Sequence, residues 1–461
     1  MLKKDKAVKG KKETIKKPSK SIDEDLDTIA IQIPSKEPSK SAEAAKKEKE
    51  RTLKDTRSKK KKTPSAPAAE KAAEKTAKEA ISIPLILAAA KGFCKYLLDM
   101  KEASLSTYFD QHLAKYTPTN CTFVEWEKNI SKNRSKCFKL IDSTRVVLDS
   151  STPASDKEDG SETYINASHI KFSNTSSEFI ITQYPLPHTI NDFWRMVTSK
   201  NVTHIISIFS PNNDKSIEEF RKPPTSTVAH VVPSTTNVEF GCATSPGKSS
   251  ARDAIMIRSR RCNVYQGSFF PMYVGYYINQ DGWLINTRIK EPDQRNRDWM
   301  TTFTVEVVPD GCSEATFARV YNCSTWNWKQ VPTEEKLLLA LVRAPYSNNS
   351  SGLVPNYNKS HPIIVMCDLG LDRSATVVLT SIIIELILDG KTPDCDALFK
   401  KMRDQRAHVF TTSIFYTYAI RTALVYLKLK FQLLNDSAGL DMKKMIDNAL
   451  EKVPFFSKNV K

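Results

Sequence analysis

The 461-residue sequence lacks the marks of several protein classes. Its nine cysteines form no CxxC pair and no His/Cys cluster at zinc-ligand spacing, which argues against a structural metal site and a disulfide framework. The first residues, MLKKDKAVKGKK, lack the apolar core of a signal peptide, and the apolar run from Ile81 to Ala90 is too short to span a bilayer. We therefore expect a reduced protein without a membrane span, located in the cytoplasm or alternatively in the nucleus.

Aromatic residues are missing from the first 80 residues, which carry 24 Lys/Arg against 14 Asp/Glu. Such a segment cannot bury enough apolar surface to offset its ordering entropy, so we expect a disordered basic tail over residues 1–80. The cluster from Lys59 to Lys62 suits an import signal or contact with an anionic surface, although a solvated low-complexity tail explains the same composition. Because no aromatic residues interleave the lysines, contact with nucleic acid would be non-specific.

Beyond residue 80 the hydrophobic pattern changes to alternating helical and strand-like runs. The short apolar runs FIITQ (179–183) and IIVMC (363–367) predict buried strands, and SATVVLTSIIIELIL (374–388) predicts a helix buried on most faces. Strands interleaved with helices favour an α/β fold. Residues 211–260 are rich in Pro, Ser and Thr, which predicts loops.

The most informative stretch is HPIIVMCDLGLDRSATVVL, residues 361–379. A strand that ends at Cys367 and leads into a helix N-terminus directs backbone N–H groups and the positive end of the helix dipole at one point. A cysteine held there is stabilised as a thiolate, and Arg373, six positions later, can bind a phosphoryl group with two hydrogen bonds. The pattern indicates thiolate attack on phosphorus, whereas the plain alternative is a buried cysteine at a strand end.

Further segments match one family in order: KNRSK (132–136) with DSTRV (142–146), TYINASHI (163–170), TQYPLP (182–187), NDFWRMV (191–197) and MRDQR (402–406). Together with the loop after Cys367, they make residues 95–430 resemble the tyrosine-specific protein phosphatase domain. The resemblance implies a single α/β domain over residues 81–435, with a highly twisted mixed sheet flanked by helices, followed by a C-terminal extension over 436–461. It implies no metal and no cofactor.

The resemblance also assigns roles to individual residues. Cys367 takes the position of the nucleophile, Arg373 that of the phosphate-binding arginine, and Ser374 that of the hydroxyl which stabilises the thiolate. The loop between them, which would bind the phosphate, consists of Asp368, Leu369, Gly370, Leu371 and Asp372. A further set matches positions that are largely structural in the family, and we expect scaffold roles for its members: Arg145, Tyr164, Asn166, Arg195, Arg403 and Arg406.

Several positions depart from the family pattern. Asp368 and Asp372 replace a serine and a glycine, and we expect both carboxylates to flank the anion site and repel a phosphate dianion. Trp328 occupies the general-acid position, and an indole cannot protonate a leaving phenolate. The remaining replacements affect water positioning and substrate contact: Thr411 and Phe415 stand for two late glutamines, Ser135 for the aromatic wall that contacts phosphotyrosine, and Cys137 for an acid that holds the substrate backbone.

Three functions remain open on these residues. The first is a pseudophosphatase that binds or scaffolds phosphorylated protein partners. The second is a weakly active phosphatase that hydrolyses phosphotyrosine or another phosphate ester through Cys367 and Arg373. In the third, the fold is inert and the basic tail is the working part, through contact with an anionic surface. The sequence does not indicate the oligomeric state.

Overall fold

The computed structural model describes residues 83–149, 161–209, 239–242, 268–280, 282–291, 299–347, 352–432, 434 and 436–455. The tail predicted over residues 1–80 and most of the stretch 211–260 lie outside the described residues. All described residues belong to one compact unit.

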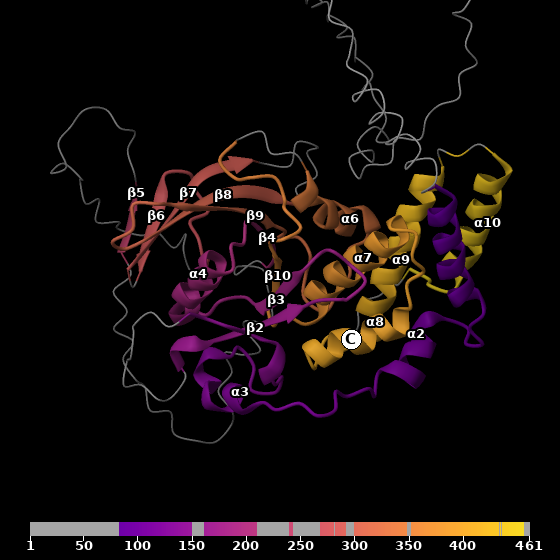
Figure 1. The fold of residues 1–461 in the computed structure, drawn as a ribbon, viewed down its shortest axis with the longest axis horizontal. Coiled ribbons are helices and arrows are strands. Elements are labelled where there is room, and N and C mark those ends of the chain that lie inside the picture. Colours follow the sequence, from indigo (N-terminus) through magenta and orange to yellow (C-terminus); the bar gives the residue numbers. More distant parts are fainter. Residues whose placement is uncertain are drawn as a thin grey trace, which may run out of the picture. The chain divides into compact units, whose positions relative to one another are not determined.

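A mixed sheet of ten strands forms the centre of the described fold (Figure 1). Its strands are β1 (Arg145–Val147), β2 (Tyr164–Ile170), β3 (Phe179–Gln183), β4 (His204–Ile208), β5 (Glu239–Cys242), β6 (Tyr276–Gln280), β7 (Trp283–Glu291), β8 (Thr301–Pro309), β9 (Thr316–Asn322) and β10 (Ile363–Cys367). They lie in the order β1-β2-β3-β10-β4-β9-β8-β7-β6-β5. The strands predicted from FIITQ and IIVMC are confirmed as β3 and β10. The predicted loop stretch 211–260 contains β5, which pairs with β6.

Four neighbouring strands of the sheet, β3, β10, β4 and β9, run parallel, and the pairs outside them are antiparallel. All residues of β3, β4 and β10 are buried, as is typical of parallel strands covered on both faces. The register places Cys367 opposite Gln183 of β3 and Ile208 of β4. Cys367 therefore lies at the carboxyl edge of the parallel strands, where loops converge.

Helices cover both faces of the sheet. They are α2 (Leu105–Tyr108), α3 (Val124–Lys128), α4 (Ile190–Ser199), α6 (Glu335–Arg343), α7 (Asp372–Leu388), α8 (Cys395–Gln405), α9 (Ser413–Phe431) and α10 (Ser437–Glu451), and residues 83–98 are also helical. Ile364 and Met366 of β10 share a core cluster with Phe193 and Trp194 of α4. Because strand side chains alternate, Cys367 points to the opposite face. The helix predicted over residues 374–388 is confirmed as the buried α7. The predicted fold class, a mixed sheet flanked by helices, is thus confirmed.

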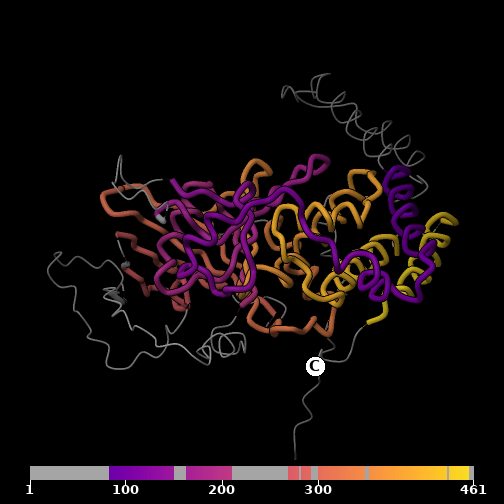
Figure 2. Tube along the Cα trace, turned by 90° about the horizontal axis from the view of Figure 1, so that it is seen from below, coloured from indigo at the N-terminus to yellow at the C-terminus, as the bar shows by residue number. Residues whose placement is uncertain are grey.

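The two ends of the described chain meet at the helical end of the molecule. Figure 2 shows the indigo helix of residues 83–98 beside the yellow α10. Lys452 Nζ donates to the carbonyl oxygens of Met100 and Glu102, and Arg421 of α9 donates to the carbonyl oxygen of Val453. The predicted C-terminal extension therefore contains a helix that packs against the domain. None of the helices in the described part of the chain has the length and apolarity needed to cross a membrane.

Candidate functional site

The loop after β10, residues 367–373, is called the signature loop below. Its first carbonyl groups point out of the loop, because the Tyr184 N–H donates to the oxygens of Cys367 (2.7 Å) and Asp368 (3.1 Å). In a planar trans peptide the C=O and the following N–H point in opposite directions. The N–H groups of Asp368 and Leu369 are therefore directed toward the inside of the loop, as an anion cradle requires.

Arg406 fixes the next two peptide groups in the same sense. Its guanidinium donates to the carbonyl oxygens of Gly370 (2.6 Å) and Leu369 (3.1 Å), and on its other side to Asn166 Oδ1 and Ser168 Oγ of β2. Arg406 is buried, and this burial lowers its pKa to about 10, so it stays charged at neutral pH. These Arg406 hydrogen bonds, called the clamp below, keep the backbone of the signature loop in the shape of an anion cradle.

A close approach to β3 fixes the middle of the signature loop. Gly370 has a φ of +63°, and a Cβ there would overlap the carbonyl oxygen of Thr182 and lie 2.8 Å from the amide nitrogen of Gln183. Both contacts are backbone atoms of a buried strand, which cannot move aside as a flexible side chain can. Two independent features therefore require a glycine at position 370: the positive φ angle and the lack of space for a side chain.

We expect Gly370→Ala to lower the free energy of unfolding by about 3 kcal/mol or more, because strain and overlap add. The matched control is Gly311→Ala, where φ is +76° but no atom lies within 4 Å of the added methyl group. That variant should lose only the dihedral strain, about 1 kcal/mol. Urea denaturation followed by circular dichroism measures both. Equal losses in the two variants would show that the approach to β3 does not constrain the loop.

Arg373, the residue expected to bind phosphate, is bound by the protein itself. Its side chain is 2% exposed, and Nη2 lies 3.1 Å from Asp368 Oδ1 in an ion pair. Its Nη1 donates to the carbonyl oxygen of Trp326 at 2.7 Å. The other carboxylate oxygen of Asp368, Oδ2, is buried without a hydrogen-bond partner. The positive charge of the site is thus neutralised by a carboxylate of the same loop.

The neighbouring Cys367 is a thiol rather than a thiolate at neutral pH. Burial and the negative charge of Asp368 together raise the pKa of Cys367 to about 11, while Arg373 and Ser374 act in the lowering direction without prevailing. A reactive cysteine needs the opposite balance, in which positive groups outweigh desolvation. Cys367, Arg373 and Ser374 do lie together as expected, but burial and the carboxylate of Asp368 outweigh the positive charge that would activate the sulfur.

The second aspartate of the loop behaves differently from the expectation that both carboxylates flank the anion. Asp372 Oδ1 accepts the Thr411 N–H (2.6 Å), and Oδ2 accepts the Thr411 hydroxyl (2.7 Å). Asp372 is the first residue of α7. Its two hydrogen bonds with Thr411 direct its side chain to the turn before α9 and not to Arg373. Burial raises its pKa to about 6, against the lowering effect of the two Thr411 hydrogen bonds. Thr411, which the family resemblance assigns to the water-positioning position, is therefore engaged by Asp372.

The segment at the general-acid position, residues 326–330, is called the acid-position loop. Trp326 is buried, and its Nε1 donates to the carbonyl oxygen of Gln330 at 2.6 Å. Trp328 is half-buried, and the Lys329 ammonium lies 4.1 Å from the centroid of its indole ring. The loop contains no carboxyl group and no histidine. It therefore offers no carboxylic acid to protonate a leaving group, and its one ammonium group, that of Lys329, packs over the Trp328 ring.

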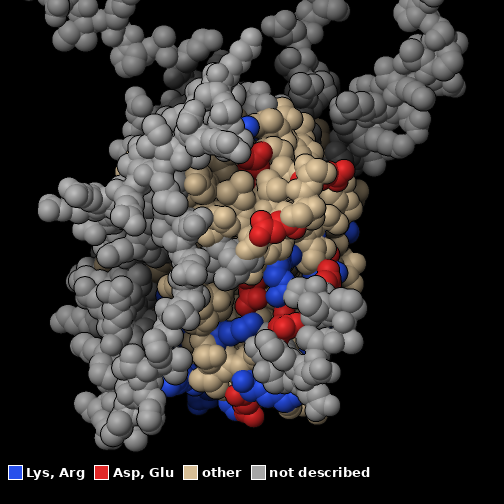
Figure 3. Space-filling model, turned by 90° about the vertical axis from the view of Figure 1, so that its left-hand side faces the viewer, with Lys and Arg blue, Asp and Glu red and all other residues tan. Residues whose placement is uncertain are grey.

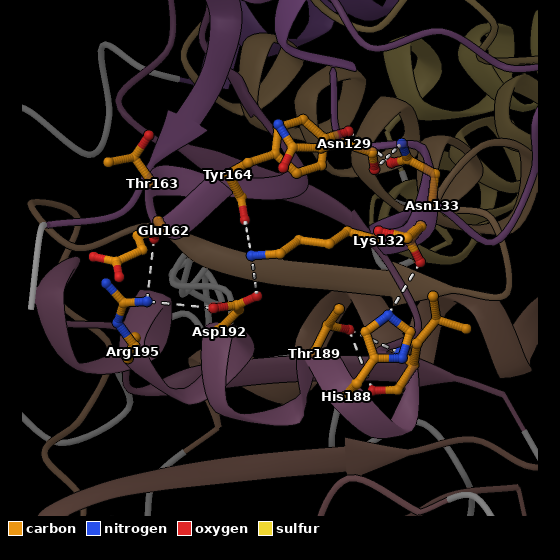
Figure 4. A network of polar contacts seen from close by, with 12 residues as sticks. Asn129, Lys132, Asn133, Glu162, Thr163, Tyr164, His188, Thr189, Asp192 and Arg195 are labelled. Atoms are coloured by element: carbon orange, nitrogen blue, oxygen red, sulfur yellow. Dashed lines mark hydrogen bonds and ion pairs between the residues drawn. The ribbon is translucent and has the colours of Figure 1, made fainter. Parts of the chain in front are cut away.

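The segment that carries Ser135 is anchored firmly to β2 and α4 (Figure 4). Lys132 Nζ contacts Asp192 Oδ2 at 2.9 Å, and Arg195 Nη1 contacts Asp192 Oδ1 at 3.3 Å. The Tyr164 hydroxyl donates to Asn133 Oδ1 at 2.6 Å. Tyr164 and Arg195 thus have the scaffold contacts expected of them, and the segment next to the signature loop is held in a fixed position.

Little space remains where a phosphotyrosine side chain would enter. A cavity of about 10 Å³ is lined by Ser135, Phe138, Lys139, Leu140, Asn166, Gln183, Leu369, Leu371 and Arg406. This volume is enough for about one water molecule. Ser135 is 7% exposed and supplies no aromatic wall, and its hydroxyl oxygen accepts the Cys137 N–H. An aryl phosphate enters only if the surrounding loops move.

A larger groove of about 500 Å³ lies beside the cavity and shares Phe138 with it. Thr411 and Arg403 also line this groove. Arg403 donates to the carbonyl oxygens of Ala114, Tyr116, Val409 and Phe410, so its charge serves the scaffold, as expected from the sequence. Within the described residues, no group of three or more His, Cys, Asp or Glu side chains is placed to hold a metal ion.

Two contacts that shape the site were not predicted from the sequence. One is the Asp368–Arg373 ion pair, because the sequence places both residues in the loop without showing which way their side chains turn. The other is the anchoring of the loop by the Tyr184 N–H. The only available signal for the second was that Tyr184 directly follows a buried strand parallel to β10.

A model of the protein-tyrosine phosphatase family matches residues 129–240 and 255–425, which is more than half of the sequence. The chain belongs to this family. Among the curated relatives, tyrosine-protein phosphatase 69D of Drosophila melanogaster is 26% identical over 67% of this chain and 17% of its own length. Human tyrosine-protein phosphatase non-receptor type 18 is 25% identical over 64% of this chain and 51% of its own length. A solved structure of the catalytic domain of the latter covers 69% of this chain and 90% of its own, with 20% identity and a TM-score of 0.45.

The chain spans less than two thirds of the length of these curated relatives. The family is shown for the phosphatase-type domain, which the family model matches over residues 129–240 and 255–425.

Proposed function

We propose that this chain is a pseudophosphatase, a protein-tyrosine-phosphatase-type domain that binds or scaffolds protein partners and has negligible turnover. The observation that carries the proposal is the buried ion pair between Asp368 and Arg373. A guanidinium already neutralised by a carboxylate offers a phosphate dianion little net attraction. Phosphorylated partners would reach Arg373 only by displacing Asp368.

Two further losses support the proposal. Cys367 is protonated at neutral pH, so the nucleophile is present in its unreactive form. The acid-position loop holds Trp328 in place of a carboxyl group, and losing a positioned acid costs on the order of 10² to 10⁴ in rate. The two losses concern different groups of one step, the attacking sulfur and the acid for the leaving group, so restoring one does not restore the other.

The alternative is a weakly active phosphatase that works through Cys367 and Arg373, since both groups remain at the end of β10 and the start of α7. Turnover of a generic aryl phosphate by the full chain separates the two functions. We expect no rate above that of the Cys367→Ser variant. A rate that depends on Cys367 would establish the enzyme and refute the pseudophosphatase.

The described part of one face of the domain does not favour a role based on charge alone. On the face shown in Figure 3, Lys/Arg and Asp/Glu side chains are interspersed among the described residues, and neither sign forms a continuous field.

We propose a cytoplasmic location with the nucleus as the alternative. This is supported by the free thiols of the described cysteines, among them the buried Cys94 and Cys395 and the exposed Cys137.

Restoring the acid alone should not restore catalysis. We expect Trp328→Asp to leave aryl phosphate turnover within about tenfold of the unmodified chain, because catalytic groups that act as a unit are strongly non-additive. The new carboxyl group would still face a neutralised Arg373 and a protonated Cys367. A rise of about a thousandfold, the gain that a positioned acid gives in a competent site, would mean that the cradle is functional.

A further inference from the structure

We infer that Asp368 is a built-in ligand that holds the acid-position loop in place through Arg373. The inference deepens the proposed function and rests on it, since it assigns a regulatory role to the same site. It follows from one guanidinium that joins two segments which are about forty residues apart in the sequence: the signature loop, through Asp368, and the acid-position loop, through the backbone of Trp326.

The connection consists of three contacts in series, of which the first two are buried and the third is part-buried. Asp368 Oδ1 pairs with Arg373 Nη2 at 3.1 Å, and Arg373 Nη1 donates to the Trp326 carbonyl oxygen at 2.7 Å. Trp326 Nε1 then donates to the Gln330 carbonyl oxygen at 2.6 Å, which closes the loop on itself. The Arg373 side chain is 2% exposed, so water does not replace these contacts when one of them is lost.

Asp368 supplies the counter-charge of the guanidinium in this position. A buried arginine needs a counter-charge, and leaving one unpaired is strongly unfavourable. Without Asp368, the Arg373 side chain gains by moving toward solvent or toward a bound anion. The hydrogen bond to Trp326 depends on the same rigid, planar group, so it weakens when the guanidinium moves. The position of the acid-position loop is thereby coupled to occupation of the anion site.

The hold is exchangeable rather than permanent. Asp368 Oδ2 is buried with no hydrogen-bond partner, so the carboxylate retains an unsatisfied acceptor in its present position. An oxyanion that takes over Arg373 would release Asp368 while keeping the Trp326 contact. The acid-position loop is therefore held with the built-in carboxylate or with an external anion, and is released when neither is present.

Hydrogen exchange followed by mass spectrometry on the full chain tests this coupling. In Asp368→Ser, we expect the amides of residues 326–330 to exchange at least about tenfold faster than in the unmodified chain, because a local opening becomes easier. Orthovanadate added to this variant should restore the protection. Asp368→Asn, which keeps the shape of the side chain and removes its charge, should change exchange in the same direction.

The matched control is Asp372→Asn, which removes a carboxylate from the same loop that pairs with Thr411 instead of Arg373. It should leave exchange of residues 326–330 unchanged. Unchanged exchange in both Asp368 variants, or an equal rise in the Asp372 variant, would overturn the inference. So would exchange that stays fast in Asp368→Ser while calorimetry shows bound vanadate. Aryl phosphate turnover by the unmodified chain would defeat the proposed function and leave this exchange pattern unaffected, so the two failures are distinguishable.

Discussion

Replacing Asp368 by serine should convert the signature loop into a working anion site, which binds orthovanadate at least tenfold tighter than the unmodified chain, about 1.4 kcal/mol. The substitution removes the carboxylate that pairs with Arg373 at 3.1 Å and leaves the loop N–H groups directed inward. The same change removes a charge that raises the pKa of Cys367. We therefore expect iodoacetamide to alkylate Cys367 faster at pH 7, by at least about tenfold.

Two controls make this result specific to the ion pair. Adding Arg373→Met to the Asp368→Ser variant should abolish the gain in vanadate binding, because the positive charge is then missing. Asp372→Gly alone should change vanadate binding by less than about threefold, since Asp372 is engaged by Thr411. If Asp372→Gly gave the larger gain in vanadate binding, Asp372 and not Asp368 would be the carboxylate that blocks the anion site.

Arg406→Met should lower the free energy of unfolding by about 3 to 5 kcal/mol, the cost of removing one partner from a buried charged network. Methionine fills a similar volume but donates no hydrogen bond. The carbonyl oxygens of Leu369 and Gly370 and the polar atoms of Asn166 and Ser168 would then lose their shared donor. Urea denaturation followed by tryptophan fluorescence measures the loss.

Arg288→Met is the matched control for Arg406, because the Arg288 side chain is 50% exposed and its contact with Glu306 is 3.7 Å long. It should cost no more than about 1 kcal/mol, as exposed ion pairs do. A similar, small cost for Arg406→Met would show that the signature loop keeps its shape without the clamp.

The elements that position the site were predictable from local patterns. β3, β10 and α7 are predominantly apolar runs, and burial on both faces makes such runs easy to recognise in a sequence. Cys367 and Arg373 came together at the carboxyl edge of the sheet because the strand, the loop and the helix that carry them are consecutive in the sequence.

The direction in which each loop aspartate turns was not predictable. Asp368 lies next to Cys367 and Asp372 next to Arg373 in the sequence, which suggests equivalent roles. Their partners differ because Asp372 contacts Thr411, in the turn before α9. Thr411 lies 39 residues later in the sequence, so the fold and not the local sequence brings it to Asp372. Side-chain orientation in a loop is set by such distant contacts, and hydrophobic periodicity carries no information about them. β5 was missed for a related reason, because it lies inside a stretch dominated by turn-forming residues.

Calorimetric titration of the unmodified full chain with a phosphotyrosine peptide tests the occupied anion site most directly. If Asp368 neutralises Arg373 as the ion pair shows, no binding heat that depends on Arg373 should appear below about millimolar peptide, a binding free energy of about −4 kcal/mol. Binding at micromolar affinity that disappears in Arg373→Met would contradict this result. The site would then be a competent trap for phosphorylated partners, and Asp368 would yield Arg373 to them at little cost.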